Sequence, residues 1–352
     1  MQLNLKKLIN HSITLAFSAV IFLTGCSSQS SSLESSPLSK QNFVLGTVAR
    51  ITLYDHQSDE LLEQAFSKLS ELENTLSINK TNTLIDKINE NSGIAPVEVD
   101  EETYSLIEKG IHYSELTSGA FDITVGPLVK LWNIGFADFK VPTATEIAET
   151  LPLLNYEFIT LDPTNHSVYL EKKGMQLDLG GIGKGYAADE VASLLKENGV
   201  EHAIIDLGGN IFALGDKPGN KLWTIGVQDP FNPRGKSLGT LQVANKSLVT
   251  SGIYERFNTA EDGTRYHHIL NPSTGYPFEN EISGVSIISD SSTDGDALST
   301  STFALGVKEG LAFIESLDGI DAIFVTTDKK VYLTSGVKEQ FKLTNSEYTL
   351  CE

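Results

Sequence analysis

A glycine-rich stretch at residues 178–189 carries the residue types that hold phosphate groups. Four of the six residues from Gly180 to Gly185 are glycine, and Lys184 stands among them. Glycines let the backbone approach a ligand closely, and free N–H groups at a helix start attract anions. The spacing matches neither the P-loop nor the strict dinucleotide-binding pattern, because glycine follows the lysine and Ala188 replaces the third glycine. The stretch predicts either a phosphate site or a tight strand–helix connection.

An aspartate and a threonine lie four residues apart in Asp296-Ala-Leu-Ser-Thr300. On a helix this spacing places both side chains on one face. A carboxylate and a hydroxyl are hard oxygen donors that suit Mg²⁺ better than zinc, and Mg²⁺ completes its shell with water and substrate phosphates. The alternative is that Asp294 or Asp296 caps the start of this helix.

Two histidines, His267 and His268, precede a turn marked by Asn271-Pro272 and Gly275. A histidine at a loop edge can act as a general base because its pKa lies near neutrality. The alternative is that both histidines pack within the turn. No Cys/His pair has zinc spacing, which argues against a zinc site.

Two further loops combine glycine turns with polar side chains. Residues 118–127 turn at Gly119 and again at Gly126, and Asp122 between these turns could hold a ligand or cap a turn. Residues 250–256 join several hydroxyls to an arginine. Each loop alone is a weak indication of a site.

Apolar periodicity predicts the elements that position these residues. We expect helices over residues 58–76 and 100–117, one from the glycine-rich turn to Gly199, and one after Asp296. Strands are expected at 43–54, 176–179, 202–207, 222–228, 239–243, 282–289, 321–326 and 330–334. Helices and strands are mixed but do not alternate strictly, which favours an α+β fold over a doubly wound sheet.

The N-terminus has the features of an export signal. Lys6 and Lys7 precede an apolar run over residues 13–23, which is too short to span a bilayer permanently, so residues 1–25 read as a signal peptide. The small residues before Cys26 resemble a bacterial lipoprotein signal, which implies cleavage before this cysteine and a lipid on its thiol.

The expected domain organisation follows from composition. Residues 26–42 are serine-rich and predict a flexible tether, and residues 43–347 form the expected folded domain. The formal net charge of −20 argues against nucleic acid as a partner. Only Cys351 remains after Cys26, so no internal disulfide is expected.

Seven short motifs follow one another between about residues 43 and 306. They are Leu45-Gly46-Thr47, Gly119-Ala120-Phe121-Asp122-x-Thr124, Asp178-Leu-Gly-Gly-Ile-Gly-Lys-Gly, Leu207-Gly208-Gly209-Asn210, Ser251-Gly252-x-Tyr254, His268-Ile269-Leu270-Asn271-Pro272-x-x-Gly275 and Asp296-Ala-Leu-Ser-Thr300. In this order they resemble the ApbE family, the FAD:protein FMN transferases. The resemblance covers nearly the whole mature domain and implies a T-fold-related, two-lobed single domain.

The resemblance implies a reaction and its partners. Mg²⁺-dependent cleavage of the FAD pyrophosphate would move FMN onto a threonine or serine hydroxyl of an acceptor protein, with release of AMP. Acceptors would be membrane redox subunits with a D-x-x-[ST]-G-A-[ST] type motif, as in Na⁺-translocating NADH:quinone reductase or Rnf complexes. The lipid on Cys26 would hold the enzyme at a membrane, facing the periplasm.

By the same resemblance, Asp296, Thr300 and the carbonyl of Gly181 would bind Mg²⁺. His268 would take the proton from the acceptor hydroxyl, which is a poor nucleophile without a base. The FAD site would be lined by a larger set, in which Lys184 holds flavin or phosphate groups: Leu45, Asn79, Ala120, Phe121, Asp122, Asp178, Lys184 and Ile269.

One departure from the family keeps a second function open. Asn79 stands where many members carry a tyrosine that stacks on the dinucleotide, and loss of that face leaves hydrolysis of FAD to FMN and AMP as an alternative. A non-enzymatic flavin-binding lipoprotein is a further alternative. The combination of Asp296, Thr300 and His268 argues against a carrier, because binding alone needs no base.

Overall fold

Local capping signals begin the two long N-terminal helices where the sequence predicts them. In the computed structural model, which describes residues 36–351, α1 spans Asp59–Leu76 and α3 spans Glu101–Leu116. The side chain of Ser58 accepts from a backbone N–H in the first turn of α1. Asp100 does the same for α3, with 2.7 Å between its Oδ1 and the accepted nitrogen. These caps satisfy N–H groups that a helix start leaves without partners.

A nine-stranded sheet forms the centre of the domain, in the order β1-β2-β6-β7-β10-β13-β14-β15-β17. Neighbouring strands run antiparallel, except for the parallel pair β15 and β17. The bounds are β1 Leu38–Val44, β2 Thr47–Leu53, β6 Ala203–Leu207, β7 Asn210–Leu214, β10 Lys246–Gly252, β13 Ile282–Ser289, β14 Asp321–Thr326, β15 Lys330–Leu333 and β17 Thr349–Leu350. This antiparallel sheet confirms the α+β prediction.

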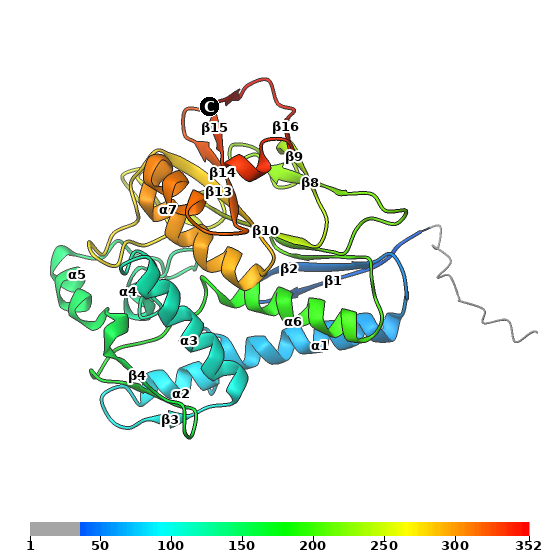
Figure 1. The fold of residues 1–352 in the computed structure, drawn as a ribbon. Coiled ribbons are helices and arrows are strands. Elements are labelled where there is room, and N and C mark those ends of the chain that lie inside the picture. The colour runs from blue at the N-terminus through cyan, green and yellow to red at the C-terminus, as the bar shows by residue number, and fades with distance from the viewer. Residues whose placement is uncertain (1–35, 352) are drawn as a thin grey trace, which may run out of the picture. The chain divides into compact units, whose positions relative to one another are not determined.

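The two faces of the sheet are covered differently (Figure 1). Helices α1, α6 (Gly183–Glu197) and α7 (Ser292–Glu315) pack on one face. A three-stranded sheet of β8 (Trp223–Gln228), β9 (Ser237–Val243) and β16 (Phe341–Leu343) packs on the other. Alternation along β14 serves both layers, since Phe324 faces the helices while Ile323 and Val325 face the small sheet.

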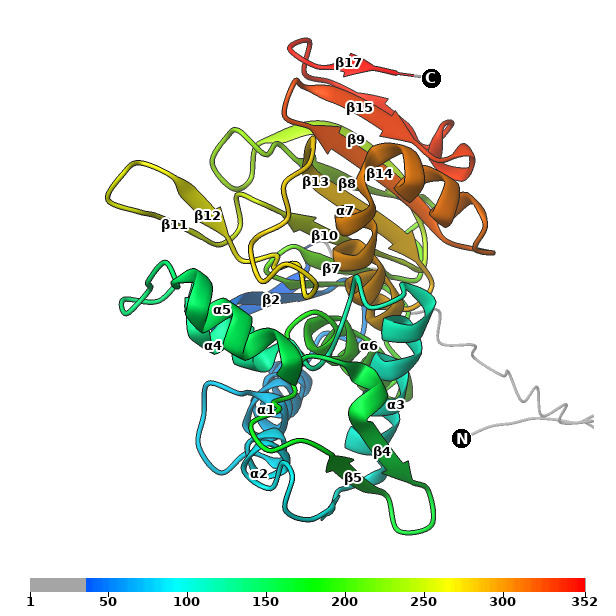
Figure 2. The same ribbon diagram turned by 90° about the vertical axis from the view of Figure 1, so that its left-hand side faces the viewer.

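The long connection between β2 and β6 contains α1 to α6 and forms the lower part of the views (Figure 2). The remaining elements are α2 Leu84–Glu90, β3 Val97–Glu98, α4 Gly126–Trp132, α5 Ala144–Thr150, β4 Ile159–Asp162, β5 Ser167–Leu170, β11 Phe257–Thr259 and β12 Arg265–His267, with short 3₁₀ turns at 151–153, 156–158 and 335–337. Among the described residues, no helix is long and apolar enough to cross a membrane.

The predicted strand at residues 176–179 is wrong. Only Gln176 makes a bridge, to Val125. The backbone of Leu177 is instead bonded on both sides by the Asn89 amide, which accepts from its N–H at 2.6 Å and donates to its carbonyl at 3.1 Å. A side chain thus takes the place of a neighbouring strand, which apolar alternation cannot reveal.

Several predicted boundaries also need correction. The β-like segment at 43–54 is a hairpin whose first strand begins at Leu38, so residues 38–42 belong to the sheet rather than to the predicted tether. At the other end, β17 lies beyond residue 347. Helix α7 begins at Ser292 and not after Asp296, because the Ser291 hydroxyl caps it. The predicted signal peptide and Cys26 lie outside the described residues.

Candidate functional site

The glycine-rich loop leads into α6 directly against the first turn of α7. A Cβ on Gly185 would overlap the carbonyl oxygen of Ser292 and lie 2.8 Å from Cβ of Asp296. Glycine is therefore required for this close approach. The Gly185 N–H donates to Asp296 Oδ2 at 2.9 Å, so the aspartate of α7 binds the free N-terminus of α6.

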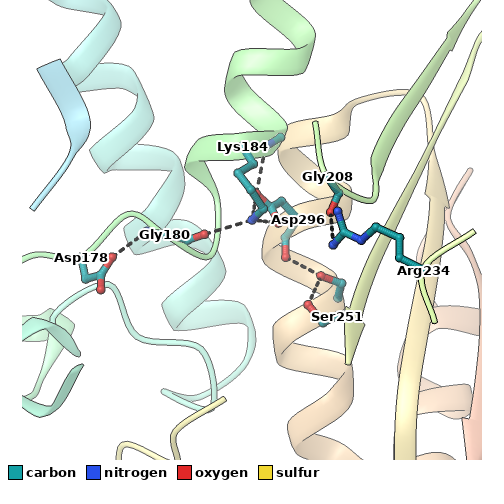
Figure 3. Close-up of polar contacts among 9 residues, drawn as sticks. Asp178, Gly180, Lys184, Gly208, Arg234, Ser251 and Asp296 are labelled. Carbon is teal, nitrogen blue, oxygen red and sulfur yellow. Dashed lines mark hydrogen bonds and ion pairs between the residues drawn. The ribbon is translucent and has the colours of Figure 1, made fainter. Parts of the chain in front are cut away.

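Lys184 and Asp296 form an ion pair at the centre of the site (Figure 3). Lys184 Nζ lies 3.2 Å from Asp296 Oδ1 and donates to the Gly180 carbonyl at 3.3 Å. The main chain of Asp296 is tied to β10 as well, because Ser299 Oγ donates to its carbonyl and lies 2.7 Å from Ser251 Oγ. Asp296 is thus held through both its carboxylate and its main chain.

The three predicted metal-binding residues lie together. A Cβ on Gly181 would be 3.7 Å from Thr300 Oγ1, and Asp296 is 3% exposed on the same face of α7. Neither aspartate caps α7, because Ser291 does so and Asp294 pairs with Lys109, whereas Asp296 accepts from the first turn of α6. A buried carboxylate, a hydroxyl and a nearby loop carbonyl are a donor set that fits a hard cation.

The loop after α3 forms the neighbouring wall. The Asp178 N–H donates to the Ile123 carbonyl at 2.8 Å, and the ring of Phe121 lies 2.9 Å from the position of a Cβ on Gly181. Asp178 Oδ1 accepts from Gly180 N at 2.7 Å. Burial raises the pKa of Asp178, while this hydrogen bond and the charge of Arg256 oppose the rise.

The carboxylate of Asp122 stabilises the turn in which it lies. Its Oδ1 accepts from the backbone and the hydroxyl of Thr124 at 2.8 and 2.7 Å, and its Oδ2 accepts from Tyr156 N at 3.2 Å. Burial raises the pKa of this carboxyl, and the three hydrogen bonds oppose the rise. Of the two roles that the sequence allowed, the structure shows the capping one.

The other predicted FAD-site residues are distributed around these loops. Leu45 lies in the β1–β2 turn with a φ of 54°, and Ile269 is buried in the main core. Ala120 lies in the turn that follows α3, where its N–H donates to Thr117. Asn79 is exposed between α1 and α2, and its N–H donates to the Ser77 hydroxyl. Among the described residues, Asn79 makes no hydrogen bond to the other predicted FAD-site residues.

The hydrogen bonds of the two histidines separate their roles. His267 uses both ring nitrogens, because Nε2 donates to the Phe278 carbonyl at 2.9 Å and Nδ1 accepts from Ile269 N at 3.3 Å. His268 Nδ1 lies 3.1 Å from the Arg256 carbonyl. Because a carbonyl can only accept, Nδ1 carries the proton and Nε2 of neutral His268 keeps its lone pair. His268 therefore has a basic nitrogen available, and His267 does not.

The surroundings keep His268 neutral. Burial lowers the pKa of His268 to about 3, and the positive charges of Arg256 and Lys184 act in the same direction. The same two cations also act on Asp178. The positive charges of Arg256 and Lys184 thus act on both His268 and Asp178.

If His268 is the base that the resemblance implies, we expect the rate of FMN transfer to stay constant as the pH falls through the usual pKa range of histidine. A depressed pKa means that His268 stays unprotonated well below pH 6.5 and loses its basic form only as the pH approaches its own pKa. The measurement is kcat/KM against pH on folded protein, with the fold checked by intrinsic fluorescence. An ascending limb centred near pH 6.5 that shifts in Arg256→Gln would contradict this expectation.

Two further residues of this site have partners that the sequence did not indicate. Arg256 lies by the β1–β2 turn, with its guanidinium 4.0 Å from the position of a Cβ on Gly46, and its side chain packs against Gly135. Asp189 on α6 binds the start of α7. Both lie in or beside segments that the sequence marked as candidates: Arg256 follows the Ser251–Tyr254 motif, and Asp189 ends the glycine-rich stretch. The type of each residue, however, did not indicate which groups it would bind.

A second group of potential ligands lies elsewhere. Asp55, Glu201 and His202 place ligand atoms within 4.8 Å of one another. Asp55 accepts from the backbone N–H groups of Glu201 and His202 at 3.0 and 3.1 Å, so it already holds the turn before β6. Asp55 lies just after the C-terminal end of β2, whereas Thr47 begins this strand, so the group is separate from the site described above.

Two glycines of the loop should respond oppositely to alanine. Gly185→Ala should destabilise the fold by about 1–3 kcal/mol, because its Cβ meets backbone. Gly183→Ala should be neutral or stabilising by up to about 1 kcal/mol, because nothing lies within 4 Å of its Cβ and alanine favours helix. Urea denaturation measures both. Equal midpoints for the two variants would show that α6 and α7 are not packed this closely.

The chain is similar to members of one protein family over most of its length. A family model described as the ApbE family matches residues 45–324. The chain is 39% identical over 309 residues to the FAD:protein FMN transferase of Klebsiella pneumoniae (strain 342), covering 88% of this chain and 95% of that protein. It is 37% identical to the FAD:protein FMN transferase of Treponema pallidum (strain Nichols), covering 89% and 91%.

Solved structures show the same likeness. The ApbE protein of Thermotoga maritima is similar with a TM-score of 0.80 and 33% identity, covering 87% of this chain and 99% of that one. The flavin transferase ApbE from Vibrio cholerae is similar with a TM-score of 0.77 and 26% identity, with the same coverage. The likeness thus extends over most of the chain in both sequence and fold.

Proposed function

The chain belongs to the ApbE family, and we propose that it is an FAD:protein FMN transferase, moving FMN from FAD to a serine or threonine hydroxyl of an acceptor protein. The observation that carries this proposal is the site itself. One loop and one helix bring Gly181, Asp296 and Thr300 together, and a neutral His268 shares the electrostatic surroundings of Lys184. A carrier would need no such base.

In the proposed reaction, the acceptor hydroxyl oxygen attacks the phosphorus on the FMN side of the FAD pyrophosphate. A new P–O bond forms, the P–O bond to AMP breaks, and AMP leaves with the bridging oxygen. The hydroxyl proton passes to Nε2 of His268. That nitrogen is free because Nδ1 donates to the Arg256 carbonyl, and it is unprotonated because burial disfavours the charged ring.

The remaining charges suit a pyrophosphate. Asp296, Thr300 and the Gly181 carbonyl would hold Mg²⁺, which when bound neutralises pyrophosphate charge and stabilises the leaving AMP. Lys184 can reach phosphate oxygens from its position beside Asp296, and Arg256 adds a second cation. Phe121 and Asp178 form the wall against which the dinucleotide would lie.

The test is flavin transfer in vitro. The purified domain is mixed with FAD, Mg²⁺ and a carrier protein bearing a D-x-x-[ST]-G-A-[ST] segment, and a fluorescent flavin band should survive denaturing electrophoresis. The matched control replaces the last Ser or Thr of that segment by alanine and should give no band. AMP and free FMN without a band would support FAD hydrolysis, which the exposed, non-aromatic Asn79 keeps as the second candidate. Neither product would support a flavin carrier.

The proposal extends to location and natural acceptors. Cys26 is proposed to carry a lipid that holds the enzyme at the periplasmic face of a membrane. Redox subunits of the Na⁺-translocating NADH:quinone reductase or Rnf type are the proposed acceptors. Labelling of cells with a radioactive fatty acid tests the anchor, because Cys26→Ala should abolish incorporation into this protein.

A further inference from the structure

The starts of α6 and α7 bind each other through two carboxylates. Asp296 of α7 accepts from Gly185 N in the first turn of α6. Asp189, one turn further along α6, accepts from the first two N–H groups of α7: Ser292 N at 2.8 Å and Thr293 N at 2.9 Å. Each helix therefore supplies an anion to the N-terminus of the other, where the helix dipole favours negative charge.

Asp189 is fully engaged in this contact. Its Oδ2 also accepts from the hydroxyls of Ser291 and Thr293, at 2.9 and 2.6 Å. Together with the two backbone bonds, four donors from three successive residues of one chain segment converge on one carboxylate. An arrangement of this kind fixes both the rotation and the axial position of the first turn of α7.

The fixed turn is the one that presents the metal donors. Asp296 and Thr300 lie one and two turns after Ser292, on the face toward the glycine-rich loop. A small rotation of α7 would carry Thr300 Oγ1 away from Gly181, although neither residue touches Asp189. The overlap that a Cβ on Gly185 would create shows how little free space separates the two helices.

We propose that Asp189 is a positioning residue for the metal site, which sets the geometry of Asp296 and Thr300 against Gly181 without contacting metal or FAD. The inference rests on the proposed function only in taking Asp296, Thr300 and the Gly181 carbonyl as the cation ligands. Residues behind metal ligands typically change metal affinity by about 10–100-fold when altered. Asp189→Asn should therefore weaken cation binding by roughly tenfold or more.

The experiment is titration of the full domain with Mn²⁺ alone, with the free ion followed by electron paramagnetic resonance. Mn²⁺ is a hard cation that accepts the same oxygen donors. Asp189→Asn keeps the size of the side chain but removes its charge. Thr293→Val removes one hydroxyl bond to Asp189 and should weaken binding less, which keeps the test available if the first variant unfolds.

The matched control is Asp229→Asn. Asp229 is also buried and also accepts four hydrogen bonds, from Phe231 N and from the side chains of Asn232, Asn345 and Tyr348, but it follows β8 of the three-stranded sheet. It should cost comparable thermal stability and leave Mn²⁺ affinity unchanged. Wild-type affinity in folded Asp189→Asn and Thr293→Val, or an equal loss in Asp229→Asn, would overturn the proposal. If wild type binds Mn²⁺ but transfers no FMN, the proposed function fails while this inference stands.

Discussion

Asp296→Asn should abolish most FMN transfer while leaving the fold intact. Asparagine keeps an oxygen that can accept from the Gly185 N–H, so the contact between α6 and α7 survives. The lost negative charge is the only carboxylate charge of the proposed donor set, and without it the Lys184 ammonium repels a cation. Metal stabilisation of a transferring phosphoryl group is worth several kcal/mol, so the rate should fall by about 10²–10⁴-fold.

The matched control for this variant lies on the same helix. Asp294 is in the first turn of α7 and pairs with Lys109 at 2.5 Å, away from the glycine-rich loop. Asp294→Asn keeps a side-chain oxygen toward Lys109 and should leave transfer near the wild-type rate in the folded protein. Initial rates over a Mg²⁺ titration measure both. A wild-type rate for Asp296→Asn at saturating Mg²⁺ would refute the metal assignment, and equal losses in both variants would trace the effect to the helix instead.

Local signals made much of the fold predictable. Strands β13 and β14 have the predicted bounds, and α1 and α3 begin at the predicted caps, because burial alternation and side-chain caps are encoded within a few residues. The start of α7 was misplaced by a turn, although its cap is equally local. Ser291 stands in a serine- and aspartate-rich run, where several residues have the chemistry of a cap.

Contacts between distant segments were beyond prediction from the residues alone. The Asn89 amide that replaces a strand beside Leu177 comes from α2, far away in the sequence. The partner of Asp189 lies at the start of α7, and nothing in the glycine-rich stretch indicates it. The order of the motifs indicated a set of candidate residues, but only the fold shows that Asp122 stabilises a turn while Asp296 binds the start of α6.

Removal of the proposed base should have an effect of similar size. His268→Ala should lower the rate of FMN transfer by about 10²–10⁴-fold, the usual contribution of a positioned general base. His268→Gln should lose as much, because its amide can still donate to the Arg256 carbonyl but has no basic nitrogen. FAD affinity, measured by flavin fluorescence, should change little in either variant, since the lost group acts on the acceptor proton. Added imidazole should restore part of the rate of the alanine variant.

A variant of the neighbouring His267 is the control for this assignment. His267→Ala removes two hydrogen bonds and a packing contact with Phe303, whose ring centroid lies 5.8 Å from that of His267. It should therefore lower thermal stability, yet keep transfer within about tenfold of wild type below its melting temperature, because both of its nitrogens serve the fold. If His267→Ala loses as much transfer as His268→Ala while still folded, the hydrogen-bond argument for a free Nε2 on His268 is wrong, and the base must be sought elsewhere in the site.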